Sequence, residues 1–175
     1  SVENIECLDA RGVKRAVIDQ LRSCDWIRYG QNVIITGHTG TGKTYLACAL
    51  AHMGCREGFR GLYFYGPKLT RALALAHADG SLPSLLKKIS KAQVLVIDDW
   101  SLSKLDEQRY RDLLEILDDR LGSGATVLTS QIPIDRWHET IPDPTLADAI
   151  LDRVIHSAHR IELKGERSEE RRVGK

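Results

Sequence analysis

Residues 33–44 of this chain read Val33-Ile34-Ile35-Thr36-Gly37-His38-Thr39-Gly40-Thr41-Gly42-Lys43-Thr44. A short apolar run leads into a glycine-rich segment that ends in Gly-Lys-Thr, and an apolar, alanine-rich segment follows over residues 45–53. This order is typical of a strand, a phosphate-binding loop and a helix, with the G-x-x-x-x-G-K-[ST] pattern placed where phosphate binding requires it. The stretch therefore predicts a nucleoside triphosphate site at the junction between a strand and a helix.

Phosphate binding by this loop depends on its backbone as much as on its side chains. Glycines adopt conformations closed to other residues, so that successive N–H groups can point into one hollow, toward which the next helix also directs its N-terminus. Lys43 is expected to reach the β- and γ-phosphates, and the Thr44 hydroxyl to hold Mg²⁺. We predict that ATP is bound by the loop residues Gly37, His38, Thr39, Gly40, Thr41, Gly42, Lys43 and Thr44.

The composition is that of an ordinary globular protein. The 175 residues are 42% hydrophobic and 28% charged, which predicts one domain with a proper core. No apolar run approaches the roughly 20 residues that span a bilayer, and no signal peptide is present, so we expect a cytoplasmic protein without a membrane partner. The net charge of +1 argues neither for nor against binding to nucleic acid.

Cysteines and histidines show no metal-ligand spacing. Cys48 and Cys55 are seven residues apart on one predicted helix, and we expect them to be two small core residues in a reducing compartment. The pair His156-x-x-His159 is too weak a pattern to indicate a metal site.

The chain is expected to comprise a lead-in segment with a short helix (1–30), a P-loop ATPase domain (31–166) and a non-native tail (167–175). It begins at Ser1 without a methionine, so we expect further residues upstream. The tail resembles the translation of a common sequencing adapter and has no apolar pattern, and we exclude it from the fold. Of the lead-in residues, Ile5, Leu8 and Trp26 either wall an adenine pocket or pack on the sheet.

Strands alternate with helices along the ATPase segment. The predicted strands are 33–36, 61–65, 94–99, 125–130 and 160–163. The predicted helices are 15–21, the segment from 45 to a glycine at 54 or 58, 68–77, 82–90, 106–121 and 144–156. This order predicts a parallel five-stranded α/β sheet with helices on both faces and right-handed crossovers. The run at 94–97 is apolar throughout, as expected for a strand covered on both faces.

Two carboxylates end that apolar run, about 55 residues after the loop. We predict that Asp98 holds Mg²⁺ through water, and that Asp99 orients the attacking water as a base. Gln131, at the end of the next strand, is the candidate that senses the γ-phosphate, with Ser130 and Thr129 as alternatives. Gln131 could instead only cap its strand.

An arginine close to the γ-phosphate would stabilise the transition state, and none is evident near the loop. Arg153, on the helix opened by Asp143-Pro144, is predicted to reach the γ-phosphate of a neighbouring protomer. Arg136 and Arg160 compete for this role, and Arg153 could also be a plain surface residue.

Several further segments carry a resemblance to a known family. Segments 95–100, 112–120, 129–133 and 137–139 are similar to the IstB family, ATP-binding helpers of insertion-sequence transposition that are AAA+ ATPases related to the helicase loader DnaC. The most particular segment is Asp143-Pro144-Thr145-Leu146-Ala147-Asp148-Ala149-Ile150-Leu151-Asp152-Arg153. The likeness runs from about residue 2 to residue 166.

The resemblance implies a P-loop NTPase fold of AAA+ type and a nucleotide-driven homo-oligomer. Such a protein binds double-stranded DNA and passes a target to a partner transposase. Carried across, Lys43 and Thr44 form the Walker A pair, Asp98 and Asp99 the Walker B pair, Gln131 the sensor and Arg153 the arginine finger. The family's N-terminal helical domain has no counterpart here, which leaves partner contact open. No residue is assigned as a second sensor arginine.

Three other functions stay open at this point. A DnaC-like helicase loader would share the ATPase chemistry and differ in its protein client. A P-loop small-molecule kinase would need an arginine-rich lid, and the one arginine cluster lies in the excluded tail. A defective fragment would bind ATP and do nothing else.

Overall fold

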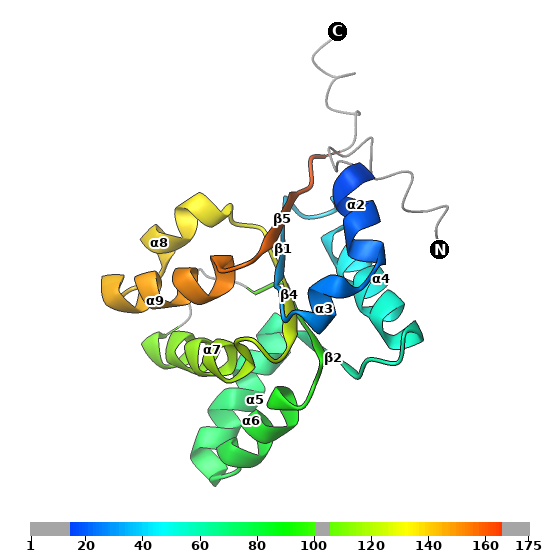
Figure 1. The fold of residues 1–175 in the computed structure, drawn as a ribbon. Coiled ribbons are helices and arrows are strands. Elements are labelled where there is room, and N and C mark those ends of the chain that lie inside the picture. The colour runs from blue at the N-terminus through cyan, green and yellow to red at the C-terminus, as the bar shows by residue number, and fades with distance from the viewer. Residues whose placement is uncertain (1–14, 101–105, 166–175) are drawn as a thin grey trace, which may run out of the picture.

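A computed structural model describes residues 15–100 and 106–165 of the chain. Five short strands form one parallel sheet, as expected (Figure 1). The strand order is β2-β3-β4-β1-β5, and every neighbouring pair is parallel. The strands are β1 (Val33–Thr36), β2 (Gly61–Tyr65), β3 (Val94–Asp98), β4 (Ala125–Ser130) and β5 (His159–Glu162). The predicted α/β fold class is confirmed.

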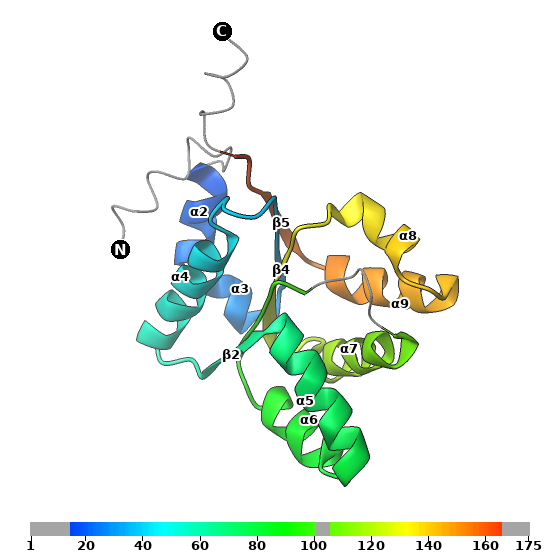
Figure 2. The same ribbon diagram turned by 180° about the vertical axis from the view of Figure 1, so that it is seen from behind.

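Helices cover both faces of this sheet. One face carries α2 (Arg15–Arg22), α3 (Asp25–Arg28) and α4 (Lys43–Arg56). The other carries α5 (Gly66–Asp79), α6 (Leu82–Ser90), α7 (Glu107–Arg120), α8 (Trp137–Thr140) and α9 (Pro144–Ile155), with a 3₁₀ turn, η2, at Ile134–Arg136. The view from behind in Figure 2 shows the same two layers on either side of the strands.

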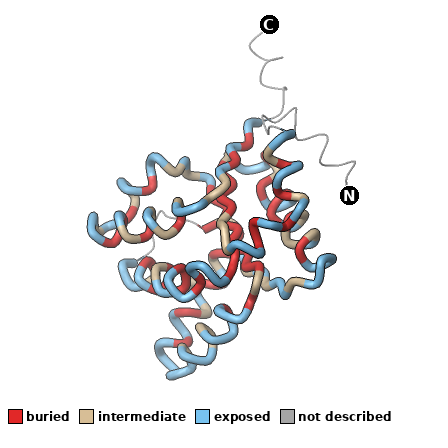
Figure 3. The backbone as a smooth tube through the Cα atoms, in the orientation of Figure 1, coloured by how far each residue is buried: buried red, intermediate tan, exposed pale blue. Residues whose placement is uncertain are grey.

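Alternation along each strand divides the core in two. Val33 and Ile35 of β1 face α2–α4, whereas Ile34 between them faces α5–α9, because successive side chains of a strand point to opposite faces. The strands β1, β3 and β4 are buried along their whole length. Figure 3 shows this burial as a central band, with the exposed backbone on the outer sides of the helices.

Helix ends follow the capping residues of the sequence. Asp106 accepts a hydrogen bond from the Arg109 backbone N–H at the start of α7, and Asp143 accepts one from Thr145 at the start of α9. The helix predicted at 68–77 begins two residues earlier, because Gly66-Pro67 forms its first turn. Proline suits the first turn of a helix, since it has the right φ and lacks an N–H that would find no partner there.

Three short elements, α3, η2 and α8, are not predicted from the sequence, since they are too short to show a periodic pattern. Trp26 on α3 is buried in the core beside α4, so it packs on the sheet. Ile5 and Leu8, its suggested partners in an adenine pocket, lie outside the described residues, as does the segment 167–175.

The expectation that Cys48 and Cys55 are core residues is wrong, because both are exposed. The buried face of α4 consists of Leu46, Ala47, Leu50 and Gly54. Each helical residue turns by about 100° from the one before it, so Cys48, next to Ala47, points off that face. Seven-residue spacing places two residues on one side of a helix but does not say which side is buried.

Candidate functional site

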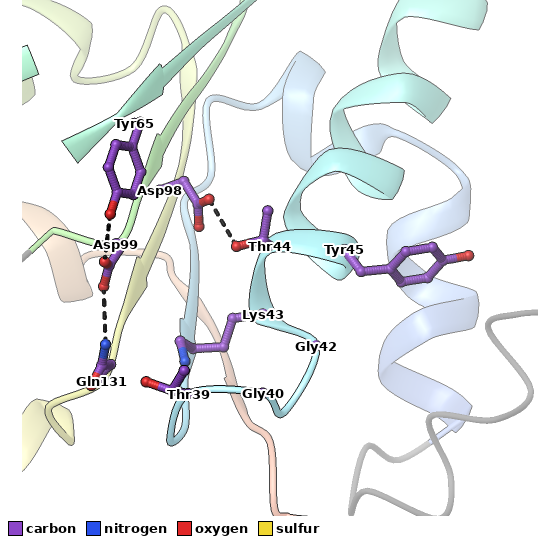
Figure 4. A pocket seen from close by; sticks show the side chains of 10 residues that line it. All are labelled: Thr39, Gly40, Gly42, Lys43, Thr44, Tyr45, Tyr65, Asp98, Asp99 and Gln131. Carbon is purple, nitrogen blue, oxygen red and sulfur yellow. Dashed lines mark hydrogen bonds between the residues drawn. The ribbon is translucent and has the colours of Figure 1, made fainter. Parts of the chain in front are cut away.

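A cavity of about 570 Å³ opens at the carboxyl ends of the strands, beside the N-terminus of α4 (Figure 4). Parallel α/β sheets bind ligands in this position. The lining residues come from the glycine-rich loop, from α4 and from the ends of β2, β3 and β4. They are Thr39, Gly40, Gly42, Lys43, Thr44, Tyr45, Tyr65, Asp98, Asp99 and Gln131.

The loop is shaped by glycines and by one carbonyl. Gly40 has φ +83° and Gly42 has φ +95°, a left-handed region that favours glycine. The carbonyl oxygen of His38 accepts hydrogen bonds from the Thr41 hydroxyl at 2.7 Å and from Lys43 Nζ at 2.9 Å. Of the predicted phosphate-binding residues, five line the cavity, whereas Gly37, His38 and Thr41 form the underside that holds the loop together.

Lys43 is largely buried at the floor of the cavity. Burial lowers the pKa of its ammonium group, and the negative charges of Asp99 and Asp98 counteract part of that effect. Its present partner is a neutral carbonyl oxygen, so the cation has no carboxylate in direct contact among the described residues. A phosphate group is the partner that such a lysine can accept.

Asp98 joins the loop to the sheet. Thr44 on α4 donates a hydrogen bond to Asp98 Oδ2 at 2.8 Å, and Tyr63 on β2 donates to the same oxygen at 2.7 Å. Thr129 on β4 donates to Oδ1 at 2.6 Å. Three hydroxyl groups from three elements therefore hold a carboxylate that is 2% exposed. Hydroxyl and carboxylate oxygens are the ligands that Mg²⁺ prefers, so Thr44 and Asp98 fit that cation.

Asp99 lies in the same cavity because the strand breaks at this residue. In a continued strand, Asp98 and Asp99 would point to opposite faces of the sheet. Asp99 instead has φ +57°, and its N–H donates to the Thr129 hydroxyl at 2.7 Å. Gly66 supports this turn, since a Cβ there would lie 2.5 Å from the carbonyl oxygen of Asp99. Both carboxylates consequently face the loop.

The three sensor candidates have different surroundings. Gln131 lines the cavity, and its Nε2 lies 3.5 Å from Asp99 Oδ1, at the outer limit of a hydrogen bond. Ser130 is fully buried, and its hydroxyl accepts the Ile132 backbone N–H. The buried hydroxyl of Thr129 donates to the carboxylate of Asp98 and accepts the backbone N–H of Asp99. Of the three, only Gln131 lines the cavity.

Arg153 is at the far edge of the sheet from the loop of its own chain. Its backbone oxygen accepts a hydrogen bond from Asn32, the residue just before β1, and its side chain donates to Asp118 of α7 at 2.6 Å. The hydrogen bond to Asp118 raises the pKa of the guanidinium group further. The competing residues Arg136, in η2, and Arg160, in β5, are exposed and do not line the cavity either.

Sequence reasoning did not identify two tyrosines of β2. Tyr63 contacts Asp98, and the Tyr65 hydroxyl lies 3.5 Å from Asp99 Oδ2. Burial and the bond to Asp98 raise the pKa of Tyr63 well above its ordinary value. The alternation of tyrosines in residues 61–65 was a usable signal, because it places both rings on one face of a strand. Tyr45 also lines the cavity, although Figure 4 shows its ring turned away from the carboxylates.

Comparisons with known proteins identify the family of this chain. The family described as IstB-like ATP binding protein matches residues 1–173. A protein of Sinorhizobium fredii assigned as an insertion sequence ATP-binding protein is 48% identical over 164 residues, which cover 94% of this chain and 67% of that protein. An IS21 ATP-binding protein of Pseudomonas aeruginosa is 31% identical, covering 89% of this chain and 58% of the relative. The chain thus spans about three fifths to two thirds of these relatives.

Solved structures show the same fold. The DnaC helicase loader superposes with a TM-score of 0.71 and 19% identity, covering 83% of this chain and 86% of that chain. DnaI superposes with a TM-score of 0.74 and 24% identity, covering 85% and 84%. Helices long and apolar enough to cross a membrane are absent from the described residues.

Proposed function

Because this chain belongs to the family of IstB-like ATP binding proteins, we propose that it is an AAA+ ATPase that assists DNA transposition. In this proposal it binds duplex DNA and passes a target to a partner transposase in the cytoplasm. The observation that carries the ATPase chemistry is the 2.8 Å hydrogen bond between Thr44 and Asp98, which joins the phosphate loop to the metal carboxylate. The names of the relatives support transposition as the setting.

ATP binding requires one local change at the loop. Lys43 Nζ would leave the carbonyl oxygen of His38 and meet the β- and γ-phosphates, while the backbone N–H groups between Gly40 and Thr44 surround the phosphate oxygens. Exchanging a neutral acceptor for an anionic one favours the protonated lysine, whose pKa burial lowers in the free protein. ATP binding would therefore stabilise the charged form of Lys43.

Hydrolysis would use groups that already face the cavity. Thr44 and Asp98 would hold Mg²⁺, which when bound offsets the charge of the phosphates. Asp99 would orient the attacking water as a base, and Gln131 beside it would contact the water and the γ-phosphate. Aspartate is one methylene shorter than glutamate, and the left-handed turn at Asp99 brings its carboxylate to the side of the loop.

The arginine that stabilises the transition state would come from a neighbouring chain. Arg153 is at the amino edge of the sheet, opposite the loop, so it cannot serve the site of its own chain. Its side chain is partly exposed and would have to exchange its bond to Asp118 of α7 for the phosphate of the neighbouring chain. A homo-oligomer that sets this edge against the next protomer's cavity would complete the site, and duplex DNA could promote it by holding protomers together.

The first test is ATP hydrolysis by the full-length protein with and without duplex DNA. We expect turnover to rise with DNA and with protein concentration, because the complete site needs two chains. Specific activity that stays constant on dilution would show that one chain is sufficient. Transfer of phosphate to a nucleoside would replace this proposal with a small-molecule kinase.

A mixing experiment tests the shared site directly. Arg153→Ala should bind ATP normally and lose about 10³- to 10⁵-fold in turnover, and Asp99→Asn should lose about 10²- to 10⁴-fold. Mixing the two variants should restore part of the activity, because some interfaces then pair an intact Asp99 with an intact Arg153. Arg136→Ala is the matched control and should keep its turnover. A mixture as inactive as its components would place the finger elsewhere.

A helicase loader is the second candidate, since DnaC and DnaI share the fold. Those structures are under 25% identical to this chain, whereas the insertion-sequence relatives reach 48%. A stable complex with a transposase encoded beside this gene would support the first candidate, and one with a replicative helicase the second. The division into a lead-in (1–30), an ATPase domain (31–166) and a non-native tail (167–175) remains part of the proposal.

A further inference from the structure

Tyr63, on the edge strand β2, contacts the carboxylate of Asp98. In the register of β2 on β3, Tyr63 lies opposite Val96, so Asp98 is two residues farther toward the carboxyl edge on the same face. Only a long side chain leaning along the strand spans such a diagonal. The Tyr63 hydroxyl does so and donates to Asp98 Oδ2 at 2.7 Å.

The three hydroxyl groups on Asp98 differ in what else they do. Thr129 also accepts the backbone N–H of Asp99, so it is part of the turn. Thr44 begins α4 and is the expected metal ligand. The hydroxyl of Tyr63 makes a hydrogen bond to Asp98 and to no other group in the described part of the chain.

The ring of Tyr63 contributes little to the core. It is 46% exposed, whereas its neighbours Leu62 and Phe64 pack against the core on the opposite face of the sheet. The ring is half exposed on an edge strand, whereas the hydroxyl contacts a buried carboxylate. The hydrogen bond to Asp98, and not packing of the ring, therefore accounts for a tyrosine at this position.

We propose that Tyr63 is a positioning residue, whose hydroxyl holds Asp98 Oδ2 in the orientation that meets Mg²⁺ beside Thr44. This inference depends on the Mg·ATP site proposed above. Without Tyr63, Asp98 Oδ2 would be held by the Thr44 hydroxyl alone. The hydroxyl of Tyr63 acts through Asp98 and is not itself a ligand.

Tyr63→Phe removes the hydroxyl and keeps the ring. Affinity for a fluorescent ATP analogue would be measured in EDTA and across a Mg²⁺ titration, with Mn²⁺ binding to the nucleotide-loaded protein followed by electron paramagnetic resonance. We expect affinity in EDTA to stay within about twofold, because the phosphate loop is intact. The metal concentration for half-maximal binding should rise by about three- to tenfold, the effect of one lost hydrogen bond of average strength, because Tyr63 acts on the metal only through Asp98.

Two tyrosine variants serve as controls. Tyr29→Phe changes a tyrosine that is 72% exposed and far from the cavity, and its metal dependence should equal that of the wild type. Tyr65→Phe removes a hydroxyl near Asp99 instead of Asp98, and its metal dependence should change by less than about twofold. Thermal midpoints of Tyr29→Phe and Tyr65→Phe should stay close to that of the wild type, since these two hydroxyls lie on exposed side chains. For Tyr63→Phe, whose hydroxyl meets the buried Asp98, the retained affinity in EDTA is the check that the site is folded.

Two results would overturn the inference. Equal metal dependence in Tyr63→Phe and the wild type would show that Thr44 and Thr129 are sufficient to orient Asp98. Equal weakening in Tyr63→Phe and Tyr65→Phe would show a general effect of the edge strand. A wild-type protein whose ATP affinity is the same with and without Mg²⁺ would instead overturn the metal site itself, so the two failures are distinguishable.

Discussion

Asp98 and Arg120 are two buried charged side chains of the same sheet, and each is 2% exposed. Asp98 lies at the carboxyl ends of the strands (the carboxyl edge) and Arg120 at their amino ends (the amino edge). Neither forms an ion pair within the described residues. Arg120, at the amino edge, donates to four neutral acceptors, which are the carbonyl oxygens of Ile89, Ala92 and Ala125 and the hydroxyl of Thr126. Asp98, at the carboxyl edge, accepts from three hydroxyl groups and faces an open cavity.

The two side chains differ in how much of their hydrogen-bonding capacity is left unused. The guanidinium of Arg120 is enclosed by fixed backbone carbonyls, and burial lowers its pKa to about 10. Gly124 shows how tightly it fits, since a Cβ there would lie 2.7 Å from the guanidinium nitrogen. The hydroxyls around Asp98 can rotate, and a carboxylate has about four acceptor positions, of which three are used. Arg120 therefore has a structural role, because it joins several backbone segments, whereas Asp98 can still bind a cation.

The largest expected effect is on stability. Arg120→Ala removes four hydrogen bonds to buried acceptors and leaves a cavity, and it should lower the free energy of unfolding by about 3–5 kcal/mol, as measured by urea denaturation. The folded fraction should bind ATP with unchanged affinity. The control Arg111→Ala, on the same helix and 53% exposed, should change the free energy of unfolding by less than about 0.5 kcal/mol. Equal effects of the two substitutions would show that the buried hydrogen bonds of Arg120 do not stabilise the fold.

The next effect is on nucleotide binding. Lys43→Ala removes a charge-assisted contact worth about 1.5–3 kcal/mol, so affinity for ATP should fall roughly 10- to 150-fold in a fluorescent-nucleotide titration. The exposed Lys68→Ala serves as the control and should bind as the wild type does. Unchanged affinity in Lys43→Ala would refute the assignment of the loop.

Asp98→Asn should separate binding from stability. The substitution keeps the size of the side chain and removes a buried charge, so the free energy of unfolding should change by less than about 1 kcal/mol or increase. The gain in ATP affinity on adding Mg²⁺ should fall by about tenfold, measured against the same titration in EDTA. If the gain persists in full, Asp98 resembles Arg120 and is only structural.

The smallest effect concerns pH at the amino edge. Burial lowers the pKa of His159 from the ordinary 6.5, and its Nε2 lies 2.8 Å from Gln31 Oε1. The unfolded chain then binds the proton first, so stability is full above about pH 6.5 and declines as pH falls toward the folded-state pKa. His159→Gln should reduce this decline in thermal midpoint, with ATP affinity unchanged. The exposed His52→Gln should follow the wild type, and an identical decline in His159→Gln would assign it to other groups.

Local pattern was enough to determine the elements of this protein. All five strands were predicted within a residue or so. The central strands β1, β3 and β4 are covered on both faces and are buried throughout, whereas β2 and β5 at the two sides of the sheet alternate between exposed and more buried residues. The caps Asp106 and Asp143 began their helices as expected, since capping needs only neighbours in sequence. The loop 37–44 was also evident, because phosphate binding imposes a fixed spacing on its residues. Asp98 and Asp99 were evident because they end an apolar strand.

Tertiary structure alone decided which side chains meet. Tyr63 contacts Asp98 because β2 lies beside β3, and Asp99 shares the cavity because its backbone turns at φ +57°. Cys48 is exposed and Arg120 is buried against the trend of their residue types. Each of these facts depends on which residues from distant segments surround a position, and helical or strand periodicity carries no information about that surrounding.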